Sequence, residues 1–372
     1  MRNGKTWAII AGGGTAGHVQ PALAIADALV DRGHERTSIH YVGSERGLES
    51  TLVQAAGYRF TLLPGRGIQR RLTIANVLAV AGILRALARA VVLVRRERPS
   101  VVVAVGGYAS VPIALAAVLW RVPIVVAEQN ARPGAANRLV GRFAVVSAVS
   151  FPGTQLPRAV VTGNPVRADV LAVDRADDGE AAKAALGIEP GRSVVLVMGG
   201  SLGARRVNLA AIDAVTRWQD RPDLAVRHLV GVRDWDEVDH LLTALPPTSK
   251  LQYQRIRYET DMPRALAAAD VAVCRSGAST CFELAAVGLP SVLVPSPNVT
   301  ADHQTANAQH LVEVGAAVLL PEAELVGDRL TATVDALLED QENLAAMADA
   351  ARSIARPRAA DDIAGLAEEH AR

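Results

Sequence analysis

The first half of the chain takes its fold from Trp7-Ala8-Ile9-Ile10-Ala11-Gly12-Gly13-Gly14-Thr15-Ala16-Gly17-His18, in which an apolar run meets four glycines and a histidine. The residues that follow are apolar at helical spacing from Val19 to Val30, and Gly33 marks the end of that helix. We therefore predict a strand, a glycine turn and a helix. Glycine lets the backbone approach a ligand closely, and a helix start offers unpaired N–H groups to an anion or a sugar.

A second glycine loop, Gly199-Gly200-Ser201-Leu202-Gly203, follows the apolar run from Val194 to Met198. Other short apolar runs alternate with helical segments, as expected for parallel strands buried on both faces. These strand candidates are residues 38–42, 101–105, 123–127, 271–274 and 291–294. The sequence therefore predicts an α/β fold of two doubly wound Rossmann-like domains, with ligand loops at the carboxyl ends of the strands.

The length of 372 residues favours two domains, each with its own core. The alternation breaks near Thr162-Gly163-Asn164-Pro165 and starts again at Val194. We expect a first domain over residues 1–164, a second over 165–345, and a helix within 346–372 that packs back on the first.

The charge balance excludes a general nucleic-acid binder, because 39 basic residues meet 38 acidic ones and the net charge is only +1. The two cysteines, Cys274 and Cys281, indicate neither a disulfide framework nor a zinc site, and we expect them to be packing residues in a reducing compartment. Residues 1–5 lead straight into a strand without a long apolar segment, so we expect no secretory signal and no membrane-spanning helix.

Several polar residues stand where strands end. His18 suits a general base or a ligand contact, although a polar residue at a helix start can also be purely structural. Glu128 and Asn130 follow another strand of the same half and face the same edge, with the same two interpretations open. In the second half, Ser279, Thr280 and Glu283 follow Arg275-Ser276-Gly277 at a helix start, which suits a diphosphate and a ribose diol or, alternatively, an ordinary helix cap.

The next helix carries Gln304 and Asn307 on one face, where their amides could contact sugar hydroxyls. Between Gly65 and Arg98, eight arginines accompany one acid, a pattern that fits docking on anionic lipid and, equally, a core helix with a solvated basic face. The residues that we expect at a membrane surface are Ile74, Val77, Leu78, Arg70, Arg71, Arg85 and Arg89.

A dehydrogenase is an alternative, because Gly12, Gly14 and Gly17 satisfy the dinucleotide pattern G-x-G-x-x-G and Glu45 follows the second strand. That enzyme would bind a nicotinamide cofactor and no UDP. A UDP-sugar epimerase, a transferase acting on a soluble natural product and a non-catalytic sugar-nucleotide sensor are further alternatives.

Six motifs in order resemble the MurG family of peptidoglycan N-acetylglucosaminyltransferases along nearly the whole chain. They are Gly12 to His18 with Pro21-Ala22-Leu23, Gly106-Gly107-Tyr108, Glu128-Gln129-Asn130, Thr162 to Arg167, Gly199 to Arg205, and Arg275-Ser276-Gly277 with Glu283-Leu284-Ala285. The resemblance implies the GT-B fold, in which two Rossmann-like domains face a central cleft. Ala16, Val111 and Leu202 depart from the commonest family spelling, and Leu202 removes a polar group beside the diphosphate.

The resemblance also implies an inverting transfer of N-acetylglucosamine from UDP-N-acetylglucosamine to the C4 hydroxyl of a muramyl-pentapeptide on a polyprenyl diphosphate. It implies no cofactor or metal, and a peripheral place on the cytoplasmic side of the cell membrane, in cell-wall synthesis, cell shape and division. It assigns catalysis to His18 and Glu128. The donor residues would be Thr15, Gly17, Arg167, Ser201, Ser279, Thr280, Glu283, Gln304 and Asn307, and the acceptor residues Tyr108, Asn130 and Asn137.

Overall fold

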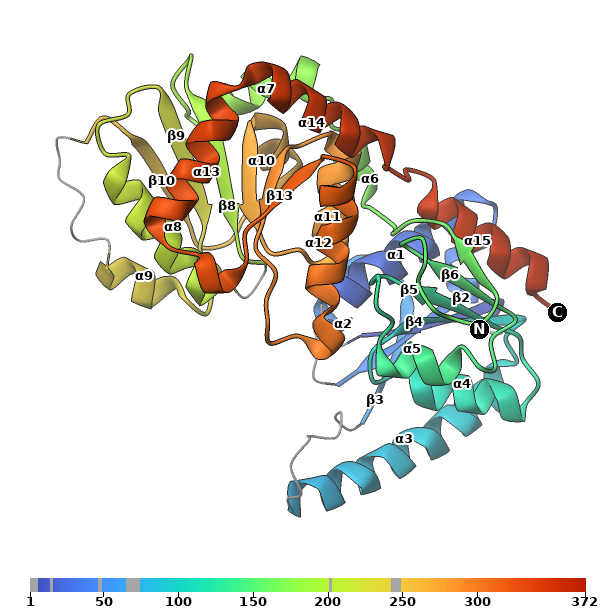
Figure 1. Cartoon of the computed structure of the whole chain (residues 1–372). Coiled ribbons are helices and arrows are strands. Elements are labelled where there is room, and N and C mark those ends of the chain that lie inside the picture. The colour runs from blue at the N-terminus through green and yellow to red at the C-terminus, as the bar shows by residue number, and fades with distance from the viewer. Residues whose placement is uncertain (1–5, 14–15, 46–48, 65–73, 201–202, 242–248) are drawn as a thin grey trace. The chain divides into compact units, whose positions relative to one another are not determined.

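The computed structural model describes residues 6–13, 16–45, 49–64, 74–200, 203–241 and 249–372, without the side chains of residues 16, 49–51 and 74–81 (Figure 1). The chain forms two compact units. One contains Met1–Arg167 together with Arg356–Arg372, and the other contains Ala168–Ala355. The first boundary lies three residues beyond the expected 164, and the return to the first unit lies ten residues beyond the expected 345.

The first unit is built on a seven-stranded sheet in the order β3-β2-β1-β4-β5-β6-β7, with every neighbouring pair parallel. This confirms the predicted doubly wound fold, and the strand order reverses between β1 and β4. The strands are β1 (Ala8–Gly12), β2 (Ile39–Ser44), β3 (Arg59–Leu63), β4 (Val101–Gly106), β5 (Ile124–Glu128), β6 (Val146–Val149) and β7 (Ala159–Val161). The helices are α1 (Ala16–Asp31), η1 (Arg36–Ser38), α2 (Glu49–Ala55), α3 (Ile74–Glu97), α4 (Ser110–Leu119), α5 (Ala135–Val140) and α15 (Ala359–His370).

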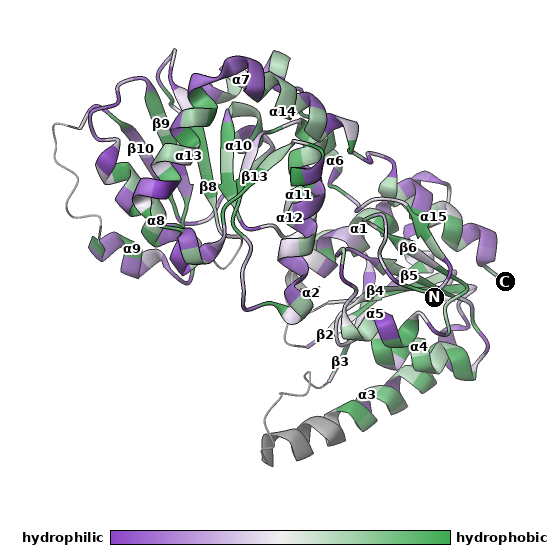
Figure 2. Ribbon diagram, in the orientation of Figure 1, coloured by the Kyte–Doolittle hydropathy of each residue, from purple (hydrophilic) through white to green (hydrophobic). Residues whose placement is uncertain are grey.

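Helices cover both faces of this sheet, which is why its inner strands are apolar without alternation. Ala8 and Ile10 of β1 point to one face, where they pack with α1, α2 and α15. Ile9 and Ala11 point to the other face, where they pack with α3, α4 and α5. In the hydropathy colouring the strands are mostly green, whereas the helices carry both green and purple residues (Figure 2).

The second unit has a six-stranded parallel sheet in the order β10-β9-β8-β11-β12-β13, which reverses between β8 and β11. Its strands are β8 (Ser193–Met198), β9 (Leu224–Leu229), β10 (Gln252–Ile256), β11 (Val271–Cys274), β12 (Ser291–Leu293) and β13 (Ala317–Leu319). Its helices are α6 (Ala168–Leu171), α7 (Arg175–Ala185), α8 (Arg205–Arg217), α9 (Trp235–Leu241), α10 (Met262–Ala268), α11 (Ala278–Val287), η3 (Thr300–Asp302), α12 (His303–Glu313), η4 (Glu322–Glu324), α13 (Gly327–Glu339) and α14 (Gln341–Ser353).

The end of the chain is divided between the two units. α14 packs against α11 of the second unit, whereas α15 packs against α1, β4 and β5 of the first. Arg32 holds α15 through Asp361 at 2.6 Å and Glu368 at 2.7 Å, and Ile363, Ala364 and Ala367 complete the apolar core beside α1. The expected helical return over 346–372 is therefore shorter, because residues 346–353 continue α14 and stay with the second unit.

Membrane-spanning segments were sought among the described helices. None of them is both long enough and apolar enough to cross a bilayer.

Candidate active site

Two glycine turns meet at the point where the strand order of the first sheet reverses. Gly106 (φ +111°) ends β4 and Gly107 (φ +78°) follows it, and a Cβ on Gly107 would lie 2.1 Å from the Gly13 carbonyl oxygen. Only glycine fits there, because the two loops run in backbone contact. Crevices at such reversals are where doubly wound sheets bind ligands.

His18, in the first turn of α1, lies beside this turn. A Cβ on Gly106 would be 3.0 Å from the His18 ring at Cδ2 and 3.3 Å from Asn137 Nδ2, so glycine leaves room for both side chains. His18 is half-buried, and Gly17 before it is exposed. Thr15 lies outside the described residues.

Glu128, at the end of β5, is 3% exposed and accepts four hydrogen bonds. One carboxylate oxygen accepts from the Asn130 amide nitrogen at 2.9 Å and from Asn130 Nδ2 at 3.2 Å. The other accepts from the Gly134 amide nitrogen and from Asn137 Nδ2, both at 3.0 Å. Glu128 thus fixes the loop after β5 and the orientation of the Asn137 amide.

The fixed Asn137 amide leaves a buried acceptor. Asn137 Oδ1 has no hydrogen-bond partner among the described residues, although Asn137 is almost fully buried. Buried polar atoms are normally satisfied, so this oxygen is suited to a hydroxyl or N–H group of a ligand. The Tyr108 hydroxyl, in contrast, already has a partner. It donates to the Pro64 carbonyl oxygen at 3.0 Å, and burial raises the pKa of Tyr108.

At the corresponding reversal of the second sheet, the loop after β8 carries glycines with positive φ at Gly200 (+91°) and Gly203 (+88°). A Cβ on Gly199 would lie 2.4 Å from the Ala204 amide nitrogen, so the loop turns tightly into α8. Ser201 and Leu202 lie outside the described residues. The neighbouring loop, after β11, leads into α11.

Backbone and side-chain bonds lock the starts of α11 and α12 together. Ser276 Oγ donates to the Gln304 carbonyl oxygen at 2.8 Å, and Asn307 Nδ2 donates to the Ser276 carbonyl oxygen at 3.1 Å. The Ser296 amide nitrogen donates to Gln304 Oε1 at 2.8 Å. Asn307 is fully buried, so its amide positions the Ser276 turn.

Three of the predicted donor residues lie along the first turns of α11 and are partly buried. Thr280 and Glu283 are half-buried one helical turn apart, and Ser279 Oγ is buried without a partner among the described residues. Arg275 is instead tied to the Val294 and Pro295 carbonyl oxygens, at 3.1 and 3.2 Å, and to Glu322. Arg167, the last residue of the first unit's longer segment, is half-buried.

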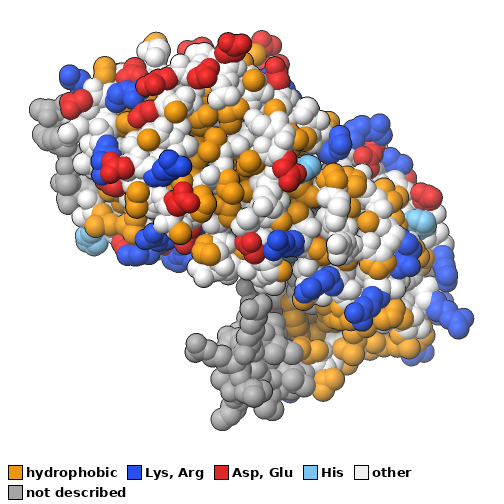
Figure 3. All heavy atoms as spheres, viewed as in Figure 1, with side chains coloured by type: hydrophobic (Ala, Val, Ile, Leu, Met, Phe, Trp, Pro, Cys, Tyr) orange, Lys and Arg blue, Asp and Glu red, His pale blue; other side chains and the backbone are white. Residues whose placement is uncertain are grey.

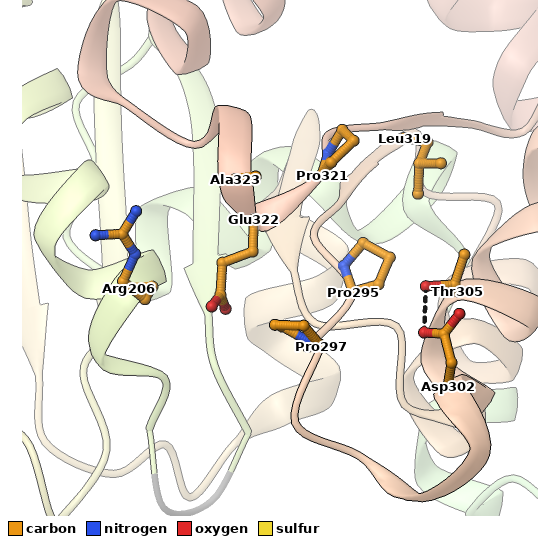
Figure 4. Close-up of a pocket in the computed structure, with 9 residues that line it drawn as sticks. All are labelled: Arg206, Pro295, Pro297, Asp302, Thr305, Leu319, Pro321, Glu322 and Ala323. Atoms are coloured by element: carbon orange, nitrogen blue, oxygen red, sulfur yellow. Dashed lines mark hydrogen bonds between the residues drawn. The ribbon is translucent and has the colours of Figure 1, made fainter.

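A cavity of about 500 Å³ lies at the same edge of the second unit, beside the loop after β12 (Figure 4). Glu322 points into it from the segment after β13, and the Thr305 hydroxyl donates to Asp302 at 2.6 Å on its opposite wall. None of the predicted donor residues that the structure describes lines it. Its lining consists of Arg206, Pro295, Pro297, Asp302, Thr305, Leu319, Pro321, Glu322 and Ala323.

Sequence reasoning missed the residues that fix this geometry. The sequence indicates Ser276 as part of a diphosphate loop or a helix cap and gives no sign of its bond to Gln304, and it does not single out Ser296 or Glu322. The polar pair Arg227-His228 inside the apolar strand β9 is a signal in the sequence for a buried hydrogen-bond network, because polar residues within a buried strand need partners.

The cysteines are buried and unpaired, as expected of packing residues. No group of three metal-ligating side chains occurs within the described ranges.

Comparison with known proteins shows the family of the chain. Residues 8–148 match the glycosyltransferase family 28 N-terminal domain and residues 194–363 the family 28 C-terminal domain. The chain is 42% identical, over 97% of both chains, to UDP-N-acetylglucosamine--N-acetylmuramyl-(pentapeptide) pyrophosphoryl-undecaprenol N-acetylglucosamine transferase of Desulforudis audaxviator.

Solved structures resemble the chain over nearly its full length. The crystal structure of Acinetobacter baumannii MurG has a TM-score of 0.76 and 28% identity, covering 98% of this chain and 100% of that one. A complex of S. aureus MnaA with UDP shares the fold, with a TM-score of 0.68, 16% identity, and coverage of 96% of this chain and 94% of that one.

Proposed function

The chain belongs to glycosyltransferase family 28 and, within it, to the MurG family of N-acetylglucosaminyltransferases, and we propose that it transfers N-acetylglucosamine from UDP-N-acetylglucosamine to a muramyl-pentapeptide on a polyprenyl diphosphate. The near full-length identity of 42% to an enzyme of that name carries the proposal. It also argues against the dehydrogenase alternative, since the glycine pattern is explained by membership of this family. Glu45 in fact lies 3.6 Å from Arg89.

The first unit would bind the acceptor. The observation that supports this is the group formed by His18, Gly106 and Asn137 at the strand reversal, where a buried Asn137 oxygen awaits a donor. In this proposal the C4 hydroxyl of the muramyl residue approaches His18, which accepts its proton as the oxygen attacks the anomeric carbon. Attack from the side opposite to the leaving group inverts that centre, and the bond from the anomeric carbon to the diphosphate breaks.

Glu128 would act as a positioning residue in this proposal and not as the base. Its two oxygens already accept four hydrogen bonds from amide groups, and a proton arriving there would weaken them. The carboxylate keeps Asn137 Oδ1 free for the acceptor. His18, half-buried beside a glycine turn, is the group that a substrate can reach.

The second unit would bind the donor. Thr280, Ser279 and the start of α11 suit the diphosphate, and Glu283 suits the ribose diol. Further expected contacts are Ser201 of this unit and Thr15, Gly17 and Arg167 of the first unit. Gln304, whose carbonyl and Oε1 are both engaged, is held at the start of α12 where it could meet the sugar. The departing UDP would be stabilised by N–H groups and hydroxyls, each helix start contributing about 0.3 to 2 kcal/mol.

The first unit would also dock on the cytoplasmic side of the cell membrane. Figure 3 shows hydrophobic side chains gathered along the lower edge of this unit, with basic side chains beside them. On α3, Leu84 and Val92 are 62% and 66% exposed, and Arg85 and Arg89 are exposed as well. The neighbouring Trp120 is 41% exposed, and its indole donates to the Val91 carbonyl oxygen at 3.1 Å. Arg70 and Arg71 lie outside the described residues, as do the side chains of Ile74, Val77 and Leu78.

The test is an incubation with labelled UDP-N-acetylglucosamine and a lipid-linked muramyl-pentapeptide in the presence of a chelator. We expect a labelled lipid-linked disaccharide and free UDP. Turnover of the donor without any acceptor would favour an epimerase, and transfer to soluble acceptors alone would favour a natural-product transferase. Either result would contradict the proposal.

A further inference from the structure

A chain of buried hydrogen bonds runs behind the glycine loop of the second unit. Tyr253 on β10, His228 on β9, Asn208 on α8 and Asp234 in the turn after β9 form what we call the β9 relay. The Tyr253 hydroxyl lies 2.9 Å from His228 Nδ1, and His228 Nε2 lies 3.0 Å from Asn208 Oδ1. Asn208 Nδ2 donates to the Val230 carbonyl oxygen at 3.0 Å and to Asp234 at 3.1 Å.

The partners fix the direction of every bond in the β9 relay. Asn208 Nδ2 faces two acceptors, so its Oδ1 faces His228, and His228 Nε2 must carry the hydrogen. His228 Nδ1 then accepts from the Tyr253 hydroxyl. Burial lowers the pKa of His228 to about 3, with Arg255 adding to the shift, so the ring stays neutral at physiological pH and this pattern persists.

The end of the β9 relay touches the end of the glycine loop. A Cβ on Gly203 would lie 2.3 Å from the Val230 carbonyl oxygen and 2.9 Å from Asp234 Oδ2, the two groups to which Asn208 is bonded. The exposed Arg233 bridges Asp234 and Gly203. Its Nε donates to Asp234 at 2.7 Å, and its Nη2 donates to the Gly203 carbonyl oxygen at 3.1 Å.

From this geometry we infer that the β9 relay, with Arg233, is a positioning element that sets Gly203 and the first turn of α8 for the diphosphate of the donor. The inference rests on the proposed donor site. Asn208 couples both partners because its own amide nitrogen donates to the Ala204 carbonyl oxygen at 2.9 Å in the first turn of α8, while its side chain holds the turn after β9. A shift of Asn208 would therefore move the loop end and the helix start together.

The role of the β9 relay can be tested, because a role in folding alone and a role in positioning Gly203 lead to different expected binding results. If the β9 relay serves only folding, its loss lowers thermal stability and weakens every ligand of the unit equally. If it positions Gly203, its loss weakens ligands that carry the diphosphate and spares uridine, which lacks it. The ratio of UDP affinity to uridine affinity separates the two roles.

The experiment measures Kd for UDP and for uridine by titration calorimetry or ligand-observed NMR on the full chain. Arg233→Gln removes an exposed side chain and so preserves the fold, and Asn208→Ser interrupts the buried part. We expect UDP to bind about 5- to 20-fold more weakly to both variants, with the uridine Kd and the acceptor KM unchanged. Arg217→Gln, at the far end of α8 and paired with Asp213 at 3.2 Å, is the matched control with wild-type values.

Two results overturn the inference: unchanged UDP affinity in Arg233→Gln, or equal weakening of UDP and uridine in both variants. Failure of the donor site itself is recognised separately. If wild-type protein does not bind UDP, or if Glu283→Gln leaves UDP binding intact, the proposed donor site is wrong. If Glu283→Gln weakens UDP binding and Arg233→Gln does not, only the β9 relay loses its role.

Discussion

The two units share one architecture, but different kinds of groups lie at the point where the strand order reverses in each sheet. In the first unit, side chains dominate: His18 and Asn137 flank Gly106, and Glu128 orders them from behind. In the second unit, the backbone dominates, because Gly203 and the starts of α8 and α11 are held by buried bonds from Asn208, Ser276 and Asn307. In the proposed function, the same fold presents a proton acceptor in one unit and an anion-binding site in the other, at the same topological position.

Each unit has, near its proposed site, a buried polar atom without a hydrogen-bond partner among the described residues. Asn137 Oδ1 in the first unit is a buried acceptor, suited to a hydroxyl such as that of a sugar acceptor. Ser279 Oγ in the second unit can donate, as a phosphate requires. The predictions below test whether this division between the units reflects their roles in the reaction.

The largest effect is expected at His18. His18→Ala should lower kcat by about 10²- to 10⁴-fold, because the acceptor hydroxyl loses its proton acceptor, while Kd for UDP stays unchanged. Steady-state transfer assays and a UDP titration on the same preparation measure both quantities. An unchanged kcat would remove His18 from the role of base.

Glu283 tests the second unit, where a substitution should change UDP affinity and leave acceptor affinity unchanged. Glu283→Gln should weaken UDP binding by about 10- to 100-fold, because a carboxylate that accepts from a ribose diol forms charge-assisted bonds. The KM for the lipid-linked acceptor should not move. A variant that loses acceptor affinity and keeps UDP affinity would reverse the assignment of substrates to units.

The exposed arginines of α3 test whether membrane contact belongs to the first unit. Arg85→Gln combined with Arg89→Gln should reduce binding to vesicles with anionic lipid by about 30-fold, at about 1 kcal/mol per cation. Co-sedimentation at low and high salt measures this, with Arg217→Gln combined with Arg264→Gln in the second unit as control. Equal losses in both double variants would show that docking is not localised on α3.

The smallest effect is expected at Glu128. Glu128→Gln keeps the shape and one acceptor oxygen, so kcat should fall less than about tenfold, whereas loss of a true general base costs about 10²-fold or more. The pH profile of kcat should keep its wild-type shape, since the base is elsewhere. If Glu128→Gln removes the acidic limb of the pH profile and His18→Ala does not, Glu128 is the base and His18 is the positioning residue.

The sequence predicts the fold well because its signals are local. Apolar runs such as Val101–Val105, glycines after strands and Gly288 at the end of α11 each follow from backbone and burial rules. The side-chain partners depend on long-range packing, and spacing cannot reveal them. Asn307 shares a helix face with Gln304, yet it is buried and turned to Ser276, and Glu128 is taken up by amides from its own loop.

The passage of the chain through both units has a consequence for biosynthesis. Residues 356–372 are made after the whole of the second unit, yet α15 supplies Ile363, Ala364 and Ala367 to the core beside α1. The ribosome must therefore complete the whole second unit before the first half of this sequence can finish burying its apolar surface. Until then that half offers an uncovered face to chaperones, and a nascent chain arrested after Ala355 would keep it exposed.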